Sequence, residues 1–483
     1  MRYNETESFR RQGKGGAFPG PRSASVGLTW GEFHPGRSGH DGSAGNRGET
    51  AACPEVLIEV KNMSDARKKT PWKDVPEEQW NDWRWQITNR ITTREALEKI
   101  LPLAPGEAQV LDRSLNRLRM AITPYYASLI DPENPDDPIR RQAVPTIAET
   151  DIKDYDLLDQ QAEVHHSPVP GLTQLYPDRG IILVTDQCSM YCRHCTRRRM
   201  AGETDRPFSR TQMEACFDYI RKTPTFRDLL FTGGDPFTVD DDTIEWLLSE
   251  ASSIPHLEIV RFGTRTPVVM PQRITDNLCR ILEKYPPVWL NTHFNHPSEI
   301  TPESKAACDR LARAGVPMGN QSVLLKGVND CPYIFRELNQ KLLTIRVRPY
   351  YIYQCDLSPG IEHFRTAVAK GIQIMEYLRG HTSGLAVPYF IIDSPGGGGK
   401  IPILPNYLVS MSDRKVILRN YEGTFTTYTE PEDKISRCPD HCAGFCERQR
   451  ELSREGLIPL FEGERVALQP ETTARKRRTE GQA

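Results

Sequence analysis

The sequence predicts an α/β protein centred on a partial (βα)6 TIM-type barrel, with an N-terminal helical region before it and a cysteine-bearing C-terminal segment after it. Short apolar or β-branched runs begin at residues 181, 229, 258, 288, 322 and 345, most of them roughly thirty residues apart. Amphipathic stretches such as TDNLCRILEKY and SKAACDRLARAG lie between the runs. Alternation of this kind is typical of repeated βα units around a parallel sheet.

Chemically reactive residues follow the predicted strands. Because the carboxyl ends of parallel strands meet at one mouth of a barrel, we expect these side chains to share one site. They are, in chain order, three cysteines, Gly233-Gly234-Asp235, Arg265, His293, Asn295, Asp356 and Asp393.

The segment before the barrel divides into two parts. Residues 1–62 are rich in Gly, Ser, Arg and Pro without a sustained apolar period, so we expect disorder there, and we expect Met63 to be the native start. Residues 63–165 carry a tryptophan cluster, and the pattern from Trp72 to about Ser128 is helical, with Thr93 predicted as an N-terminal cap. The barrel is predicted over 166–400 and a C-terminal segment over 401–483.

Composition excludes several classes of partner. With 62 basic and 64 acidic residues, the net charge of −2 argues against binding driven by attraction to nucleic acid or to an anionic membrane. We find neither a run of about 18 apolar residues nor a signal peptide, which predicts a cytoplasmic protein. Of twelve cysteines, six form two tight triplets, a pattern that favours metal binding or catalysis over disulfides.

The first triplet, in CSMYCRHC, is the strongest motif. Cys188, Cys192 and Cys195 lie on one short loop after a strand, and three thiolates can bind three corners of a 4Fe-4S cluster while the fourth iron stays open. A zinc site would require a fourth ligand, for which His194 is the candidate. A buried structural role is the other alternative.

The motif DSPGGGGK ends at Lys400. Glycines allow close approach of the backbone to a ligand, and the lysine could contact phosphate or form a Schiff base. A nucleotide-binding P-loop would place Ser or Thr after the lysine, where this chain has Ile401. An imine between Lys400 and pyridoxal phosphate is therefore the preferred interpretation.

Several long motifs together resemble the lysine 2,3-aminomutase family of the radical S-adenosylmethionine superfamily. They are CSMYCRHCTRRR, HHSPVPGLTQLYPDR, GTRTPVVMPQRIT, NTHFNHPSEIT, RVRPYYIYQCDLSPGIEHFRT and HTSGLAVPYFIIDSPGGGGKIP. The resemblance runs from about Trp72 to Cys446. It implies an isomerase in which a 4Fe-4S cluster, S-adenosylmethionine and pyridoxal phosphate meet at the barrel mouth, and an adenosyl radical starts migration of an amino group from C2 to C3.

The resemblance also implies residue roles. Tyr176 and Arg179 would bind the phosphate of pyridoxal phosphate, but Leu175 stands where the family has a further arginine, which predicts weaker cofactor retention. The residues assigned to S-adenosylmethionine are Gly233, Gly234, Asp235, His293 and Gln321.

Substrate choice follows from charge. By resemblance, Arg197 pairs with the substrate carboxylate, whereas Arg198 and Arg199 are expected in packing or solvated positions. Asp356 and Asp393 match the carboxylates that hold a distal ammonium, so a cationic side chain is favoured. L-Lysine, giving L-β-lysine, is the expected substrate, and arginine or another amino acid is the alternative.

The second triplet, in RCPDHCAGFC, is assigned to zinc. Related enzymes carry a zinc site between subunits, which would use Cys438, Cys442, Cys446 and, from the neighbouring chain, Cys331. Reduced cysteines without metal are the alternative.

The remaining expectations concern partners. We expect a free amino acid substrate, an electron donor of the flavodoxin or ferredoxin type, and a homodimer or homotetramer. Cys216, Cys279 and Cys308 are expected in the core. A non-catalytic iron-sulfur and zinc binding protein is the alternative from another class, but it would leave Lys400 and the paired aspartates unexplained.

Overall fold

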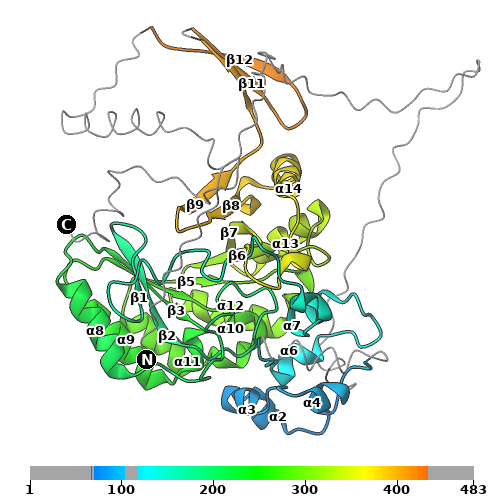
Figure 1. Ribbon diagram of the computed structural model, residues 1–483, viewed down its shortest axis with the longest axis vertical. Helices are drawn as coiled ribbons and strands as arrows, with labels where there is room; N and C mark the ends of the chain where they lie inside the picture. The colour runs from blue at the N-terminus through cyan, green and yellow to red at the C-terminus, as the bar shows by residue number, and fades with distance from the viewer. Residues whose placement is uncertain (1–66, 68–69, 104–117, 413, 433–483) are drawn as a thin grey trace, which may run out of the picture. The chain divides into compact units, whose positions relative to one another are not determined.

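The computed structural model describes residues 67, 70–103, 118–412 and 414–432 (Figure 1). Its centre is a nine-stranded sheet in which the strands lie side by side in chain order. Seven of them, β2 to β8, are parallel. Their bounds are β2 Arg179–Thr185, β3 Asp228–Gly233, β4 Ile259–Gly263, β5 Val288–Thr292, β6 Met318–Leu324, β7 Val347–Gln354 and β8 Tyr389–Ser394.

Short antiparallel strands flank the parallel ones. Strand β1 (Leu172–Thr173) pairs with β2, and β9 (Gly399–Ile403) pairs with β8. The two edges are not paired with each other among the described strands, so the sheet is open. All seven apolar runs that the sequence marks as strands, the last being VPYFIID, are confirmed.

Helices connect the parallel strands and pack along the sheet (Figure 1). Side-chain caps start several of them: Ser209, Asp240, Thr275 and Thr301 each accept a hydrogen bond from a backbone N–H in the first turn. Their bounds are α8 Arg210–Arg221, α9 Asp241–Ser252, α10 Thr266–Val269, α11 Asp276–Lys284, α12 Pro302–Arg313, α13 Pro332–Thr344 and α14 Val368–His381, with 3-10 turns η2 Pro236–Thr238, η3 Pro271–Arg273, η4 Pro297–Glu299, η5 Glu362–Phe364 and η6 Gly384–Ala386.

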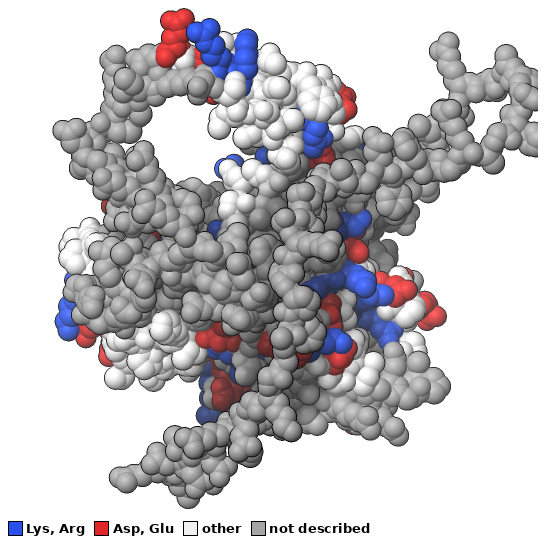
Figure 2. Space-filling model, turned by 45° about the horizontal axis from the view of Figure 1, so that its top comes forward, with Lys and Arg blue, Asp and Glu red and all other residues white. Residues whose placement is uncertain are grey.

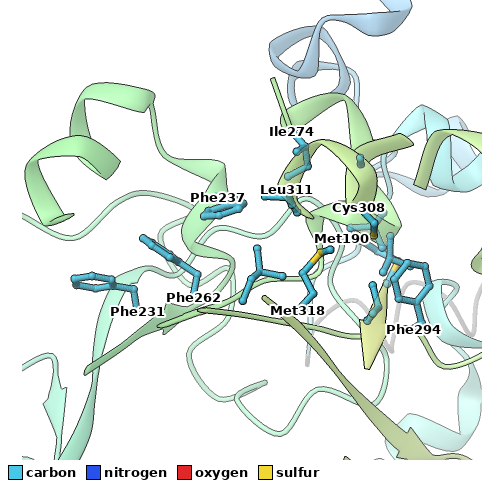
Figure 3. Close-up of a cluster of buried hydrophobic side chains, with 14 of the residues drawn as sticks. Met190, Phe231, Phe237, Phe262, Ile274, Phe294, Cys308, Leu311 and Met318 are labelled. Atoms are coloured by element: carbon cyan, nitrogen blue, oxygen red, sulfur yellow. The ribbon is translucent and has the colours of Figure 1, made fainter. Parts of the chain in front are cut away.

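The strands place alternate side chains on two different faces. One face is the hydrophobic core beneath the helices, where Phe231 of β3, Phe262 of β4 and Phe237 of η2 pack with ring centroids 5.1–5.2 Å apart (Figure 3). Cys308 of α12 lies in the same buried cluster as Met318 of β6, and Cys216 and Cys279 are buried as well, which confirms their expected core positions. The other face of the strands lines a cavity.

The described part of the region before the sheet consists of short helices. They are α2 Glu77–Asn81, α3 Trp83–Thr88, α4 Arg94–Glu98, α6 Pro124–Ser128, α7 Pro138–Ala143 and the 3-10 turn η1 Ile147–Thr150. Thr93 caps α4, as predicted. The sequence indicated a more continuous helical pattern, but Asp82 ends α2 and caps α3, and prolines begin α6 and α7. Trp80 and Trp83 are buried, which agrees with packing on a core.

A three-stranded antiparallel sheet follows β9. It consists of β10 Leu408–Met411, β11 Lys415–Arg419 and β12 Phe425–Thr429. Arg419 pairs with Glu376 of α14 at 2.6 Å, which connects this sheet to the last helix of the barrel region.

The surface carries mixed charge. In the described part of the face in Figure 2, basic and acidic side chains are interspersed, in line with the nearly balanced total charge. Within the described residues, the helices are too short or too polar to cross a membrane.

Candidate active site

A cavity of about 780 Å³ lies against the inward face of the sheet. Strands β2 to β4 and β6 to β9 contribute to its wall, as does His293 directly after β5, so the sheet curves around it. The cavity collects most of the predicted cofactor and substrate residues, as the topology suggested. They are Tyr176, Arg179, Arg197, His293, Gln321, Asp356, Asp393 and Lys400.

Lys400 enters the cavity from a hairpin. The residues between β8 and β9, Pro-Gly-Gly-Gly, allow the chain to reverse so that Asp393 and Lys400 stand directly opposite each other. The Lys400 ammonium lies 2.9 and 3.2 Å from the two Asp393 carboxylate oxygens and above the Tyr353 ring. Gly397 has φ +79°, and an added Cβ would approach Ala162 to 3.0 Å. Glycine is therefore required there by conformation and by space.

Asp356 and Asp393 form a pair of buried carboxylates. Gln160 donates to Asp356 at 2.8 Å and to the Asp393 carbonyl at 3.1 Å, and Gln161 donates to the Asp393 carboxylate at 3.3 Å. Burial and the nearby Asp393 charge raise the pKa of Asp356 to about 7, although Lys400 opposes the shift. The site therefore attracts a cation most strongly when Asp356 is ionised.

Arg197 is one of the cationic side chains of the cavity wall. Its Nε donates to Glu163 at 2.9 Å and its Nη1 to Thr232 at 3.2 Å, while Arg199 pairs with the same Glu163 and with Asp159. Burial lowers the pKa of Arg197, but the Glu163 carboxylate raises it more, so the guanidinium stays charged.

The neighbours of Arg197 are used in packing. Arg198 pairs with the fully buried Glu149 at 2.7 Å, and Arg193 pairs with the same carboxylate at 2.6 Å. The expectation that Arg198 and Arg199 are packing charges agrees with these ion pairs, because each stabilises a loop beside the cavity.

The predicted phosphate-binding residues form one group on the cavity wall. The Arg179 guanidinium stacks over the Tyr176 ring at 3.9 Å, and the Tyr176 hydroxyl accepts a hydrogen bond from the backbone N–H of Lys400 at 3.0 Å. Leu175 also lines the cavity. An arginine at that position would reach the same space.

The cysteine loop follows β2. Cys188 and Cys195 pack beside Tyr191 and Ala201, and Cys192 accepts a hydrogen bond from Arg265. Burial raises the pKa of Cys195 to about 11 and that of Cys188 well above its usual value, so a cation must accompany their deprotonation.

The three thiols share one loop but do not form a site for a single metal ion. Among the residues that the structure describes, no group of three or more His, Cys, Asp or Glu side chains is arranged to hold a metal ion. His194, the candidate fourth zinc ligand, instead contacts the Asn295 amide at 3.4 Å.

The Gly233-Gly234-Asp235 segment packs against the cysteine loop. An added Cβ at Gly233 would meet the Thr185 carbonyl at 2.3 Å, and one at Gly234 would meet the Gln187 carbonyl at 2.3 Å. The Asp235 carboxylate accepts hydrogen bonds from Thr264 and from the Arg265 backbone. The structure thus brings this segment to the cysteines, while the Asp235 carboxylate is directed toward the end of β4 rather than the cavity.

His293 directly follows β5, and Gln321 lies within the neighbouring strand β6. The His293 Nδ1 lies 3.0 Å from the Gln321 carbonyl oxygen, and both residues line the cavity. Burial lowers the pKa of His293 to about 4, so the ring is neutral at physiological pH.

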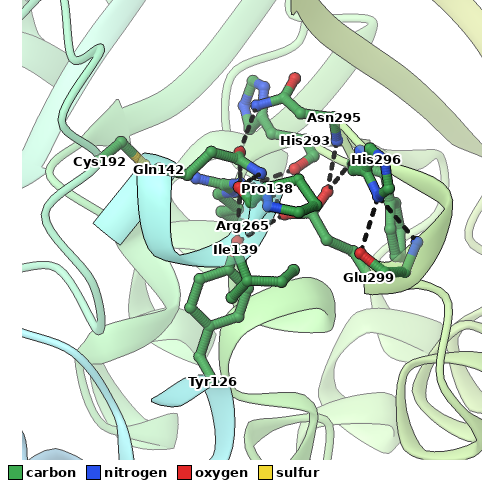
Figure 4. A network of polar contacts seen from close by, with 12 residues as sticks. Tyr126, Pro138, Ile139, Gln142, Cys192, Arg265, His293, Asn295, His296 and Glu299 are labelled. Carbon is green, nitrogen blue, oxygen red and sulfur yellow. Dashed lines mark hydrogen bonds and ion pairs between the residues drawn. The ribbon is translucent and has the colours of Figure 1, made fainter. Parts of the chain in front are cut away.

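Arg265 joins the cysteine loop to these strand ends (Figure 4). Its Nη1 lies 2.8 Å from the Cys192 sulfur and its Nε 3.0 Å from the His293 carbonyl oxygen. Its Nη2 contacts Gln142 at 2.6 Å and Glu299 at 2.8 Å. The sequence placed Arg265 at a strand end but gave it no partner.

Of the four predicted zinc ligands, Cys331 is the one that the described residues include, and it does not line the cavity. Cys331 is the residue before α13 and is partly exposed, away from the cavity wall. Cys438, Cys442 and Cys446 are outside the described residues, as is the predicted extension 1–62.

Two family models and several related proteins point to the same family. The Lysine-2,3-aminomutase family model matches residues 375–483, and the Radical SAM superfamily model matches residues 182–334. The L-lysine 2,3-aminomutase of Clostridium subterminale is 56% identical over 412 residues, which cover 85% of this chain and 98% of that protein. The chain belongs to the lysine 2,3-aminomutase family.

Other members of the lysine 2,3-aminomutase family match almost as well. The L-lysine 2,3-aminomutase of Acetoanaerobium sticklandii is 56% identical over 84% of this chain and 97% of its own length. The glutamate 2,3-aminomutase of Clostridioides difficile is 52% identical over 72% of this chain and 82% of its own length. Because the identities are so similar, substrate choice must be argued from the side chains of the cavity.

Membership implies a 4Fe-4S cluster and S-adenosylmethionine. The donor set fits the cluster, since three soft thiols lie on one loop and a buried guanidinium stands beside one of them. Lys400 fits a carbonyl cofactor, since its amine opens into a cavity that also contains Tyr176 and Arg179.

Sequence reasoning missed the residues that hold these side chains in place. Gln160, Gln161 and Glu163 come from the loop before β1 and bind the two aspartates and Arg197. Their only sequence mark is a polar run, QQAE, beside the motif HHSPVPG, and a polar run on a loop has no period from which its partners can be inferred.

Proposed function

We propose that this protein is a lysine 2,3-aminomutase that converts free L-lysine to L-β-lysine by moving the α-amino group to C3. The observation that carries the proposal is the placement of Asp356, Asp393 and Arg197 in the same cavity as Lys400. A buried carboxylate pair and the Arg197 guanidinium in one cavity are complementary to an amino acid that has a carboxylate and a distal ammonium.

The cavity side chains have separate roles. Arg197 binds the substrate carboxylate through the donors that Glu163 leaves available, and the ion pair with Glu163 fixes the orientation of its guanidinium. Asp356 and Asp393 hold the distal ammonium. Asp393 also holds the protonated Nζ of Lys400 whenever that amine is free.

The same carboxylates disfavour an acidic substrate. The distal carboxylate of glutamate would meet two buried negative groups, and like charges in a low dielectric repel strongly. Arginine carries a distal cation as lysine does, so it is the second candidate substrate.

Two cofactors supply the difficult chemistry. When bound, the 4Fe-4S cluster supplies the electron that cleaves S-adenosylmethionine, and pyridoxal phosphate supplies the conjugated carbonyl group that carries the migrating nitrogen. Cys188, Cys192 and Cys195 would hold the cluster, His293 and Gln321 with the Gly233-to-Asp235 segment would adjoin S-adenosylmethionine, and Lys400, Tyr176 and Arg179 would hold pyridoxal phosphate.

The remaining architecture is proposed on the same basis. We infer a partial (βα)6 barrel over 166–400, a helical region over 63–165, and a C-terminal segment over 401–483 that binds zinc and forms a homodimer or homotetramer. The open sheet of parallel strands around the cavity supports the barrel. An electron donor of the flavodoxin or ferredoxin type would reduce the cluster.

The test is anaerobic reconstitution with iron, sulfide, pyridoxal phosphate, S-adenosylmethionine and a one-electron reductant, followed by chiral analysis of products from lysine, arginine and glutamate. We expect L-β-lysine from lysine alone, and a strong loss of turnover in Asp393→Asn. Turnover of arginine without formation of β-lysine would overturn the assigned substrate.

A further inference from the structure

Arg265 contacts the sulfur of a cysteine assigned to the cluster. Its Nη1 lies 2.8 Å from Cys192, and the guanidinium is only 7% exposed. A charged N–H directed at a sulfur in a low dielectric is a stronger interaction than the same contact in water.

The position of this guanidinium is fixed by several elements. Its other donors bind Gln142 of α7, Glu299 of η4 and the carbonyl oxygen of His293 after β5 (Figure 4). Its backbone N–H donates to Asp235 at 2.8 Å. The side chain therefore has little freedom to leave the sulfur.

The counter-charge is buried as well. Glu299 is fully buried, and its carboxylate accepts hydrogen bonds from the Tyr126 hydroxyl and from the backbone N–H groups of Asn295 and His296. The ion pair is thus neutral in total, but its positive member faces Cys192 and its negative member faces away from it, toward η4.

We propose that Arg265 is a positioning residue that sets the reduction potential of the cluster through its hydrogen bond to Cys192. The inference rests on the proposed function. Reduction adds one electron from the external donor to the cluster, and the added negative charge is shared by the ligating sulfurs. A positive donor on one sulfur stabilises the reduced form, so the potential rises and the donor can reduce the cluster more easily.

The same residue connects the cluster loop to the predicted S-adenosylmethionine side. One guanidinium binds Cys192 and the His293 backbone, and its own backbone binds Asp235. Loss of Arg265 is therefore expected to loosen the relative placement of these loops in addition to lowering the potential.

The experiment measures the potential of the reconstituted protein by anaerobic redox titration followed by electron paramagnetic resonance. The test variant is the double substitution Arg265→Met with Glu299→Gln, which removes both charges and leaves no buried unpaired ion. At a fixed solution potential, we expect the ratio of reduced to oxidised cluster to be at least tenfold lower than in wild type. For a one-electron couple this corresponds to a midpoint potential that is lower by about 59 mV. Arg265→Lys keeps the charge, so its midpoint potential should lie closer to wild type than that of the double variant.

The chain offers a matched control. Arg273 is a fully buried arginine that pairs with Asp241 at 2.8 Å and donates to the carbonyl oxygens of Phe237 and Val239 rather than to a cysteine of the cluster loop. Arg273→Met with Asp241→Asn should lower thermal stability and leave the potential unchanged.

The outcomes separate the inference from the proposed function. An unchanged potential in the double variant, with cluster content equal to wild type, overturns the inference alone. If the double variant loses the cluster, Arg265→Gln with Glu299→Gln takes its place as the neutral variant, and a wild-type potential in that protein also overturns the inference. Failure of the wild-type protein to bind a cluster would instead contradict the proposed function.

Discussion

At the scale of single residues, Asp356 determines how the cavity responds to pH. Burial and the adjacent Asp393 raise its pKa to about 7, so its charge changes within the range in which enzymes are normally assayed. The ε-ammonium of lysine has an ordinary pKa near ~10.4 and remains charged over that range.

We predict that the KM for lysine rises as the pH falls from 8 to 6. Below pH 7 Asp356 takes up a proton and loses the charge that binds the ammonium, so KM should rise by roughly tenfold per pH unit. Steady-state kinetics across this range provide the measurement. Asp356→Asn should give a high KM that no longer depends on pH in this window, and a wild-type KM that is flat between pH 6 and 8 would contradict the prediction.

A second residue prediction concerns Leu175. It lines the cavity beside Tyr176 and Arg179 but offers no charge to a phosphate. Leu175→Arg should tighten pyridoxal phosphate binding by at least about tenfold, the effect of one charge-assisted hydrogen bond of about 1.5–3 kcal/mol. Titration of the cofactor by absorbance measures the affinity, and Leu175→Met is the neutral control. Equal affinity of the Leu175→Arg and wild-type proteins would refute the idea.

At the scale of elements, the β8–β9 hairpin combines the residues proposed for substrate and for cofactor binding. The antiparallel register sets Asp393 opposite Lys400, and the glycines between the strands make this reversal possible. Packing of Gly397 against Ala162 fixes the hairpin to the loop that carries Gln160 and Gln161.

Gly397→Ala should therefore disturb the site through the turn. An alanine at φ +79° costs about 1–2 kcal/mol, and its Cβ would press on Ala162. We expect lower thermal stability and a lower fraction of protein carrying pyridoxal phosphate, measured by calorimetry and by cofactor absorbance. Gly384→Ala is the control, since its added Cβ has no atom within 4 Å and it should behave as wild type.

The elements were largely predictable from the sequence, for physical reasons. A buried strand between helices must be apolar or β-branched, so the runs that begin at residues 181 to 345 can be recognised as strands from the sequence. A polar cap such as Thr93 likewise indicates the start of a helix. Asp356 and Asp393 were expected in one site because parallel strands end at one edge, whereas Lys400 was assigned to that site by its glycine-rich motif and by the family resemblance; all three line the cavity.

The contacts around these side chains were not predictable. The direction of the Asp235 carboxylate depends on where the Thr264 hydroxyl lies, and the orientation of Arg197 depends on Glu163 from a distant loop. Such pairs join residues far apart in the chain, and a local pattern contains no information on them.

At the scale of the whole molecule, the second cysteine triplet is predicted to join subunits through zinc. Cys438→Ala and Cys331→Ala should each lower zinc content and weaken the oligomer, because a tetrahedral site that loses one thiolate binds its metal less tightly. Metal analysis and light scattering give the two measurements. Cys279→Ala, which removes a core thiol from α11, should keep its zinc, and full zinc retention by Cys438→Ala would reject the assignment.

The pairing of Asp393 with Lys400 across the hairpin has a consequence for redesign. Replacing Asp393 to accept an acidic amino acid would also remove the carboxylate that contacts the cofactor lysine. The new variant would have to bind the acidic side chain and also keep Lys400 in position, which calls for a compensating change near Gln161 or Tyr353. Inserting or deleting one residue in the glycine turn would be equally costly, since a one-residue slip of a strand turns its side chains to the opposite face. Libraries that alter this enzyme should therefore keep the length of the turn fixed and vary Asp356 before Asp393.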